Sequence, residues 1–402
     1  MSQRWIKVIG IGEDGMNGLS ASSRILIDQA DVVIGGDRHL TMIGATNADQ
    51  MTWRSPLKDT LADIEKLKGK QVVVLATGDP MSYGIGVTLG KHFGYDQLDI
   101  VPAVGAFALA SAKMGWALTD PFTECLTLHG RPLENLSLHL RNGVKLIALS
   151  ANGETPAQAA ELLCLKGFSE SQITVLSHMG GRDEARISNI AKEWSDEKTA
   201  DLNVICIECV ADDQAASLSR IAGLPDDAFS HDGKMTKREV RAATLALLAP
   251  KPGELLWDVG AGCGSIAIEW MRADGKAIAI EDNDKRLGLM ADNALSLGTP
   301  TLKIIQGRAP ERLDGLATPD AIFIGGGLTS EGLVEACWDA LPKGGRLVAN
   351  AVTLQGETKL MEMWENWGGE MSRQSVSRLT KVGPHHGWKP FMQVTQYAVT
   401  KS

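Results

Sequence analysis

The residues best suited to chemistry lie where two apolar runs of the sequence end. The run at 255–259 leads into a loop with glycine at every second position, and the run at 277–280 ends in an acid. A helical pattern over 265–272 separates them, so we predict a strand, a glycine-rich turn, a helix and a second strand. In an open α/β sheet, ligands bind beyond the carboxyl ends of the strands, where glycines let the backbone approach closely and an acid accepts ribose hydroxyls. The residues predicted to form this site are Asp258, Gly260, Gly262, Gly264 and Glu281.

The spacing of these glycines separates two classes of cofactor. A dinucleotide fingerprint requires G-x-G-x-x-G, whereas this turn reads G-x-G-x-G and has Ser265 in the position of the third glycine. With Asp258 two residues before the first glycine, the pattern resembles motif I of the class I S-adenosylmethionine-dependent methyltransferases. The resemblance implies that the three glycines lie against the methionine and ribose of the cofactor and that Glu281 holds the ribose hydroxyls. We include Gly307 and Ala309 among the cofactor-binding positions.

Composition sets the broad class of the protein. The 402 residues exceed one typical core, which predicts two domains, and 44% hydrophobic with 22% charged residues is typical of a soluble globular protein. No apolar run approaches a membrane span, and the start of the chain leads directly into a strand pattern, so we expect neither membrane insertion nor a signal peptide. Six cysteines suggest reduced thiols in the cytoplasm, and a net charge of −9 argues against nucleic-acid binding.

The only C-x-x-C motif is formed by Cys206 and Cys209, and it lies within a strand-like run. Residues three apart on a strand point to opposite faces, so these two thiols do not share a metal ion. No second pair of cysteines or histidines completes a zinc site. We therefore interpret both cysteines as structural and predict no metal site.

The first half of the chain repeats the alternation of strands, glycine turns and helices, which predicts a second α/β domain. Its turns, taken in order, resemble those of the tetrapyrrole (corrin and porphyrin) methyltransferases over about residues 5–211. Two positions depart from that family, since Glu13-Asp14 replaces the usual proline and Ala103 replaces a usual glycine. The positions that carry the resemblance, and that it implies bind the cofactor, are Gly10, Gly12, Gly78, Asp79 and Pro80.

Two residues of this half have a structural alternative. Gly-Asp-Pro is a common turn in which the Asp side chain bonds the backbone, but its place in the ordered series favours a cofactor contact for Asp79. His129 follows a strand, and it is either a hydrogen-bonded structural residue or a substrate contact.

Polar residues followed by Gly223 and Pro225 mark the boundary between the two predicted domains. We predict a first domain at 1–211, a linker at 212–223 and a second domain at 224–402.

A basic stretch opens the second domain. Thr236 and Glu239 have the spacing of a capping box, which predicts a helix over 237–248. Its basic residues are either a solvated helix face or a site for the carboxylates of an acidic substrate, which arginine matches through its planar fork. For that second role the candidates are Lys237, Arg238 and Arg241. The segment 381–390, with two histidines and a tryptophan, is a hairpin loop or a substrate lid.

The second half also resembles a precorrin methyltransferase in which methyl transfer is coupled to decarboxylation. The similar stretches are 235–241, 258–264, 307–311, 325–327 and 350–353. Fusion of two precorrin methyltransferases implies a bifunctional enzyme of cobalamin biosynthesis with one S-adenosylmethionine per domain. By this resemblance it methylates precorrin-6 at C5 in the first domain and at C15 in the second, with loss of the C12 acetate carboxyl, to give precorrin-8. The resemblance also suggests a homo-oligomer.

Two other functions stay open at this point. The first is a class I methyltransferase that acts on a nucleic-acid base or a protein side chain, against which the net charge of −9 counts. The second is a cofactor sensor or scaffold whose first domain has lost catalysis, which the departure at Glu13-Asp14 suggests. The number of cofactors bound per chain separates a sensor from a two-site enzyme.

Overall fold

A computed structural model describes residues 4–195, 198–216 and 218–402. It divides into two compact units. The first unit ends at Ala216, and the second runs from there to Ser402 and takes in Glu134–Leu138. The division lies inside the segment 212–223 that we expected to be a linker, of which residue 217 is outside the described residues. Residues 1–3 and 196–197, in the predicted first domain, are also outside them.

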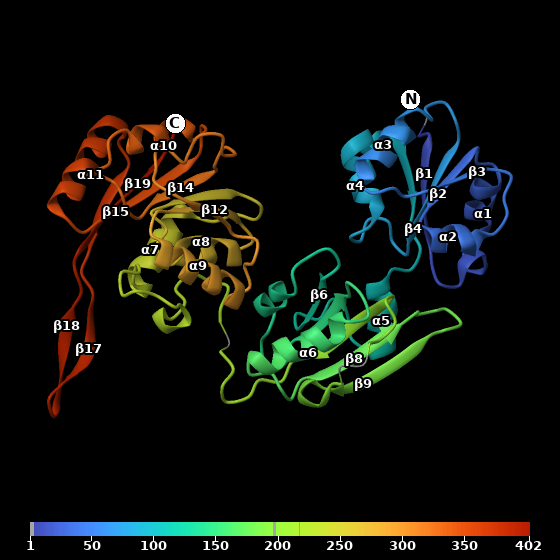
Figure 1. Ribbon diagram of the computed structural model, residues 1–402, viewed down its shortest axis with the longest axis horizontal. Coiled ribbons are helices and arrows are strands. Elements are labelled where there is room, and N and C mark those ends of the chain that lie inside the picture. The colour runs from blue at the N-terminus through green and yellow to red at the C-terminus, as the bar shows by residue number, and fades with distance from the viewer. Residues whose placement is uncertain (1–3, 196–197, 217) are drawn as a thin grey trace. The chain divides into compact units, whose positions relative to one another are not determined.

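The first unit opens with a five-stranded parallel sheet in the order β3-β2-β4-β1-β5. One face packs on α3 and α4 and the other on α1 and α2, so the central strands β1, β2 and β4 are buried on both sides and nearly all apolar (Figure 1). The strands are β1 (Ile6–Ile11), β2 (Val32–Gly35), β3 (Asp49–Thr52), β4 (Val72–Thr77) and β5 (Leu98–Val101). The helices are α1 (Ala21–Asp28), α2 (Asp37–Ile43), α3 (Leu57–Glu65) and α4 (Ile85–Phe93), with 3-10 turns η1 (Gly15–Asn17) and η2 (Tyr95–Gln97).

A second sheet completes the first unit, and it is mixed rather than parallel. Its order is β6-β7-β10-β8-β9, in which only β6 and β7 run parallel. The strands are β6 (Thr123–Thr127), β7 (Lys145–Leu149), β8 (Gln172–Ser177), β9 (Ala185–Ile190) and β10 (Asn203–Glu208). The other elements are α5 (Ala106–Met114), which packs on the sheet around Trp116, α6 (Thr155–Leu165) and η4 (Ala191–Glu193). The 3-10 turn η3 (Leu133–Leu138) follows β6 in the chain, but its residues 134–138 group with the second unit.

The second unit is built on a seven-stranded sheet in the order β13-β12-β11-β14-β15-β19-β16. Five neighbouring strands are parallel, and β19 runs antiparallel to β15 and β16. Helices α7, α8 and α9 contribute to the core on one face, and α10 and α11 to the core on the other. The strands are β11 (Leu255–Val259), β12 (Lys276–Glu281), β13 (Lys303–Gln306), β14 (Ala321–Ile324), β15 (Arg346–Ala351), β16 (Glu370–Gln374) and β19 (Val394–Thr400). The helices are α7 (Arg238–Leu248), α8 (Ser265–Arg272), α9 (Asp284–Ser296), α10 (Leu333–Ala340) and α11 (Leu354–Trp367), with η5 (Asp226–Ala228).

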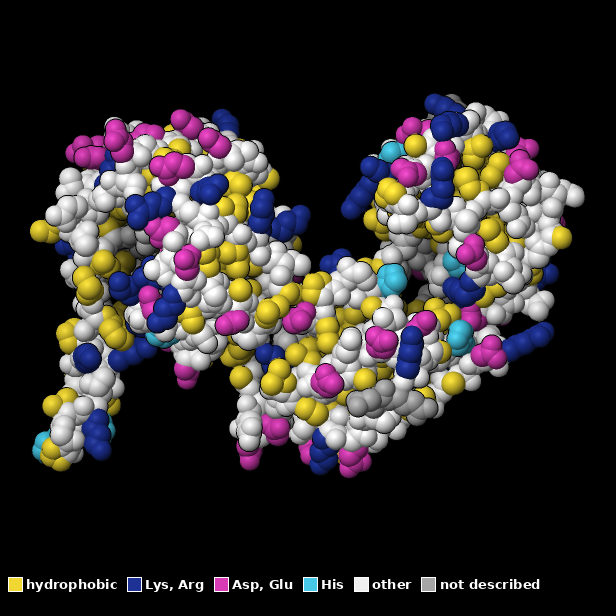
Figure 2. Space-filling view, viewed as in Figure 1, with side chains coloured by type: hydrophobic (Ala, Val, Ile, Leu, Met, Phe, Trp, Pro, Cys, Tyr) yellow, Lys and Arg dark blue, Asp and Glu magenta, His cyan; other side chains and the backbone are white. Residues whose placement is uncertain are grey.

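A two-stranded arm extends from this unit (Figure 1). Its strands, β17 (Ser377–Val382) and β18 (His385–Pro390), pair only with each other among the described strands. Hydrophobic side chains lie along its surface (Figure 2), and Trp388 is 72% exposed. The segment 381–390, predicted as a hairpin loop, is thus the end of β17, the turn and the whole of β18.

The prediction of two α/β domains, the second with a Rossmann-like sheet, is confirmed. Within the described residues, no helix combines the length and apolar character needed to cross a membrane. Buried Cys206 lies on β10 and buried Cys209 just beyond it, and burial raises the pKa of each thiol to about 12.

Candidate active site

Three loops of the first unit meet at the carboxyl ends of β1, β4 and β5. The Gly78 N–H donates to the Ile11 carbonyl at 3.0 Å, and the Ala103 N–H donates to the Gly78 carbonyl at 3.2 Å. Gly10 lies between them, and a Cβ there would be 1.9 Å from the Gly78 oxygen. Only glycine fits at this crossing, because backbone atoms surround it. The structure therefore brings together Gly10, Gly12, Gly78, Asp79 and Pro80 at the edge where parallel sheets bind ligands.

Asp79 and Pro80 form a turn in this cluster. The Asp79 carboxylate accepts a hydrogen bond from the Met81 N–H at 2.9 Å. This is the backbone bond of a Gly-Asp-Pro turn, the structural alternative that the sequence offers for Asp79. The buried Pro80 offers its carbonyl to the Gly86 N–H at 3.0 Å. Since Asp79 is half-buried, the turn bond leaves part of its carboxylate accessible. Its contact with a cofactor stays a prediction.

His129 lies on the loop after β6 in the mixed sheet. It is exposed, and its backbone N–H donates to Thr127 Oγ1 at 3.1 Å. The imidazole has no hydrogen-bond partner within the part of the chain that the structure describes. No hydrogen bond or ion pair between described residues joins His129 to the three glycine loops, so a substrate contact at this residue stays a prediction.

A polar cluster beside these loops was missed from the sequence. Glu13 directly follows Gly12, and its carboxylate bonds both the Arg38 guanidinium and His178 Nδ1. The signal available in the sequence was Glu13 itself, an acid where the resembling family has proline. Its partner His178 lies 165 residues later, a separation that no local pattern reports.

In the second unit the β11–α8 turn has the geometry that its glycines predict. Gly260, Gly262 and Gly264 have φ values of +69°, +62° and +81°, in the left-handed region that favours glycine. The N–H groups of Gly260 and Ala261 both donate to the Ile280 carbonyl, at 3.0 and 3.1 Å, which ties the turn to β12. A Cβ added at Gly262 would meet nothing within 4 Å, so the space beside this residue is open.

Glu281 joins the end of β12 to this turn. Its Oε2 accepts the Gly262 N–H at 2.8 Å and its Oε1 accepts the Asn283 N–H at 3.1 Å. Arg286 Nη1 lies 3.7 Å from Oε1. The Gly307 N–H donates to the Glu281 carbonyl at 2.9 Å, which places the β13 loop in the same cluster, and Ala309 packs against the core just beyond it.

Asp258 lies beneath the turn and is completely buried. Its Oδ2 accepts the Ala267 N–H of α8 at 3.0 Å, whereas Oδ1 has no hydrogen-bond partner among the described residues. Burial, with a smaller contribution from the Glu281 charge, raises the pKa of Asp258 to about 7. Having no exposed surface, Asp258 holds the first turn of α8 rather than contacting the cofactor directly as expected.

Arg241 was expected to bind substrate carboxylates, and the structure contradicts this. The side chain is completely buried, where Nε donates to Glu269 Oε1 at 2.5 Å and Nη1 to Asp226 Oδ1 at 3.2 Å. Nη1 also donates to the Thr236 carbonyl, Nη2 donates to the Leu224 carbonyl, and the guanidinium stacks on the Phe229 ring. The charge is neutralised inside the protein, so Arg241 is a structural residue.

The capping box predicted at the start of this helix is also wrong. Lys237 occupies the N-cap position without a side-chain hydrogen bond, and Asp226 Oδ1 accepts the Arg238 N–H at 2.9 Å in its place. Arg238 is exposed and Lys237 is half-buried. No hydrogen bond or ion pair between described residues links either side chain to the glycine turn, so their substrate contacts stay predictions.

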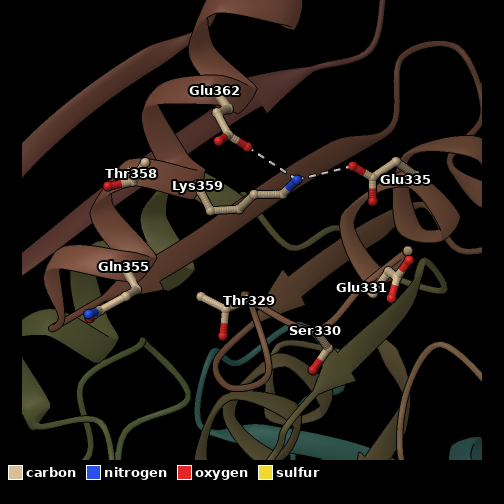
Figure 3. Close-up of a pocket in the computed structure, with 9 residues that line it drawn as sticks. Thr329, Ser330, Glu331, Glu335, Gln355, Thr358, Lys359 and Glu362 are labelled. Carbon is tan, nitrogen blue, oxygen red and sulfur yellow. Dashed lines mark hydrogen bonds and ion pairs between the residues drawn. The ribbon is translucent and has the colours of Figure 1, made fainter.

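A pocket of about 400 Å³ lies between the loop after β14 and the helices α10 and α11 (Figure 3). Lys359 Nζ lies inside it, 3.1 Å from Glu335 Oε1 and 3.3 Å from Glu362 Oε2. With a third glutamate, Glu331, the lining is acidic overall, which disfavours a substrate rich in carboxylates. The lining residues are Thr329, Ser330, Glu331, Gly332, Glu335, Gln355, Thr358, Lys359 and Glu362, none of them a predicted site residue.

Two family models match the chain. The model of the tetrapyrrole (corrin/porphyrin) methylases matches residues 6–193, and that of the precorrin methyltransferase domain matches residues 227–401. Each therefore covers one of the two halves in which the glycine turns lie.

Curated relatives match either the whole chain or part of it. A precorrin-6Y C(5,15)-methyltransferase [decarboxylating] from Sinorhizobium sp is 44% identical over 99% of this chain and 96% of its own length. A cobalt-precorrin-7 C(5)-methyltransferase of Salmonella typhimurium is 34% identical over 44% of this chain and 87% of its own. A probable cobalt-precorrin-6B C(15)-methyltransferase (decarboxylating) of Saccharolobus solfataricus is 34% identical over 37% of this chain and 78% of its own. The chain belongs to the family of precorrin-6Y C(5,15)-methyltransferases (decarboxylating).

Proposed function

We propose that the protein is a bifunctional S-adenosylmethionine-dependent C-methyltransferase of cobalamin biosynthesis. It methylates precorrin-6 at C5 in the first domain and at C15 in the second, and it removes the carboxyl of the C12 acetate, giving precorrin-8. The observation that carries this proposal is the presence of a glycine-lined strand edge in each of two units, within a chain 44% identical to such an enzyme along nearly its whole length.

The residues of the second turn fit S-adenosylmethionine. Glu281 uses two of its acceptor positions for the N–H groups of Gly262 and Asn283, and a carboxylate has about four, so acceptors remain for two ribose hydroxyls. The two backbone bonds also fix the orientation of the carboxylate before the cofactor binds. The open space beside Gly262 lies next to this acid, where the methionine end of the cofactor would lie.

When bound, S-adenosylmethionine supplies a methyl group that its sulfonium already activates. The protein therefore contributes mainly by alignment, which contributes up to about 7–11 kcal/mol in well-oriented reactions. In the first domain the backbone crossing at Gly10, Gly78 and Ala103 provides a rigid floor for that alignment. In the second domain the buried Asp258 and the bonded Glu281 hold the turn rigid.

Counting bound cofactor tests the proposal. We expect calorimetric titration of S-adenosylhomocysteine into the full chain to show two sites, with Glu281→Ala weakening one and Asp79→Ala the other. Asp79→Asn separates the two roles of Asp79, because its amide oxygen keeps the turn bond to Met81 and removes the charge. One site, lost in Glu281→Ala alone, favours a first domain without catalysis. Absence of binding contradicts the proposal.

With two sites established, the precorrin substrate and labelled cofactor show which carbons gain a methyl group. We expect Glu281→Ala to slow methylation at C15 and Asp79→Ala to slow methylation at C5. The homo-oligomer and the cytoplasmic location stay predictions. Sedimentation velocity of the purified chain would measure its oligomeric state.

A further inference from the structure

Glu13 connects the two sheets of the first domain. It follows β1 of the parallel sheet, and its carboxylate accepts from Arg38 on α2 and bonds His178, which follows β8 of the mixed sheet. The distance from Glu13 Oε2 to His178 Nδ1 is 2.8 Å, and the Glu13 side chain is only 14% exposed. A carboxylate is thus held between a guanidinium and an imidazole.

This bond selects the tautomer of His178. A carboxylate accepts and does not donate, so Nδ1 carries a proton and the neutral imidazole keeps its lone pair on Nε2. Nε2 has no hydrogen-bond partner in the described part of the chain, and the side chain is 28% exposed. His178 therefore offers an oriented and accessible proton acceptor, in the way that a carboxylate orients the base of a catalytic triad.

The backbone of His178 supports a functional role. Its φ is +48°, a conformation that non-glycine residues rarely adopt and that persists where the surroundings enforce it. The His178 N–H donates to the Leu202 carbonyl at 3.1 Å, and its carbonyl accepts the Gly181 N–H at 2.9 Å. The backbone N–H and carbonyl of His178 are thus both held by hydrogen bonds, which fixes the position of the Cα atom that carries the imidazole.

The cluster touches two of the three glycine loops. Glu13 is the residue after Gly12, and Arg38 Nη2 donates to Thr77 Oγ1, directly before Gly78, at 3.0 Å. His39 Nε2 lies 2.9 Å from the same hydroxyl. Burial, with the adjacent Arg38 charge, lowers the pKa of His39 to about 4, so this second histidine is neutral and adds no charge near pH 7.

We propose that His178 is the general base of the first domain's methyl transfer and that Glu13 and Arg38 position it, an inference that rests on the proposed function. A meso carbon that carries hydrogen forms its bond to the methyl group as the bond from sulfur to methyl breaks, and S-adenosylhomocysteine is released. The carbon then bears both hydrogen and methyl, and the macrocycle is positively charged. His178 Nε2 takes the proton, the C–H electron pair returns to the ring, and conjugation is restored.

A similar cluster elsewhere in the first domain supplies a matched control. Glu124 on β6 bonds His139 Nδ1 at 2.6 Å and also accepts from Arg141. None of these three residues contacts the glycine loops through a hydrogen bond between described residues, and His139 has no left-handed backbone. The combination of histidine, glutamate and arginine is therefore not by itself diagnostic, and what distinguishes His178 is its place and its backbone.

The experiment compares His178→Gln, Glu13→Gln and the control His139→Gln in the full chain, with precorrin substrate and methyl-labelled cofactor. We expect His178→Gln to slow methylation at C5 by about 100-fold, the lower end of general-base contributions. Added imidazole restores much of this rate, because it replaces the missing base. We expect a loss of about tenfold in Glu13→Gln and no loss in His139→Gln, with C15 methylation and S-adenosylhomocysteine affinity unchanged in all three.

Three outcomes overturn the inference. An unchanged C5 rate in His178→Gln, with an active wild type, removes His178 from the reaction while the proposed function stands. A slower rate that imidazole does not restore, together with weaker binding of S-adenosylhomocysteine, shows a purely structural role. A wild type that leaves C5 unmethylated overturns the proposed function and this inference with it.

Discussion

The two cofactor turns use glycine for different physical reasons. Gly10 in the first domain has an ordinary φ, but a Cβ there would lie 1.9 Å from the Gly78 oxygen. Gly262 in the second domain has a φ of +62°, and its Cβ would meet nothing within 4 Å. The first glycine leaves room for a second backbone, and the second bends one backbone beside open space. The same letter in a sequence motif thus predicts different consequences of substitution.

The acids of the two turns differ in a similar way. Asp79 bonds the Met81 N–H two residues further on, a local contact. Glu281 bonds the Gly262 N–H from a neighbouring strand, and buried Asp258 lies below the same turn. The second turn therefore depends on tertiary contacts of buried acids. Because burial raises the pKa of Asp258 to about 7, the stability of this turn should depend on pH.

Of the substitutions considered, Asp258→Asn should cause the largest change, and this change is in how the free energy of unfolding depends on pH. Asp258 has a folded-state pKa of about 7 against 3.8 when unfolded, so the native state keeps a proton that the unfolded chain loses. This contribution to stability is complete below about pH 4 and is lost as the pH rises through 7, at a total of about 4 kcal/mol. In Asp258→Asn the free energy of unfolding should not show this decrease with rising pH, because the amide does not ionise.

Chemical denaturation of wild type and Asp258→Asn at several pH values from 4 to 8 measures the difference. We expect the variant to gain stability relative to the wild type as the pH rises. A difference that does not change with pH would mean that Asp258 is ionised in the folded protein at neutral pH.

Gly10→Ala should be the next largest effect. The added methyl group meets backbone atoms that do not rotate away, so we expect a loss of about 3 kcal/mol in the free energy of unfolding and loss of the first cofactor site. Gly288→Ala on α9 is the control, because a Cβ there meets nothing within 4 Å and φ is ordinary. Equal stability of both variants would contradict the crossing of loops at Gly10.

Glu281→Ala tests the acid of the second turn. It removes charged acceptors of ribose hydroxyls, worth about 2 kcal/mol, which corresponds to about 30-fold weaker binding at the second site. The first site should keep its affinity in the same titration. Glu335→Ala, which removes an exposed glutamate of the acidic pocket, should leave both sites unchanged.

Gly262→Ala should have the smallest effect on stability. Without a steric clash, only the left-handed backbone opposes the substitution, at about 1 kcal/mol in the absence of cofactor. Gly344→Ala, with φ of +81° and equally open space, should lose the same amount. A loss from Gly262→Ala as large as that from Gly10→Ala would remove the distinction between the two turns.

The sequence predicts those parts of the fold that depend on local pattern. The glycine turn of the second domain, its flanking strands and Glu281 lie within 27 residues, 255–281, so one short stretch carries the whole signal. The glycine loops of the first domain are predicted from their order along the chain, since each one alone is a weak signal. That they meet at one edge follows from the parallel pairing of their strands.

The errors concern residues whose partners lie far away in the sequence. Arg241 has the sequence pattern of a basic helix, but Glu269 and Asp226 neutralise it in the core. Asp226 also replaces the cap expected from Thr236. The bond between Glu13 and His178 joins two sheets, and neither residue alone predicts it.

The arm formed by β17 and β18 should unfold locally while the rest of the second unit stays folded. An isolated two-stranded hairpin is marginally stable in water, and this arm is fastened at its base by Arg378, which pairs with Asp226 and Glu239 at 2.7 Å each. The arm should therefore behave as a separate cooperative unit whose amide hydrogens exchange long before those of the seven-stranded sheet. Because these ion pairs are partly exposed, salt should loosen the arm while leaving the sheet intact.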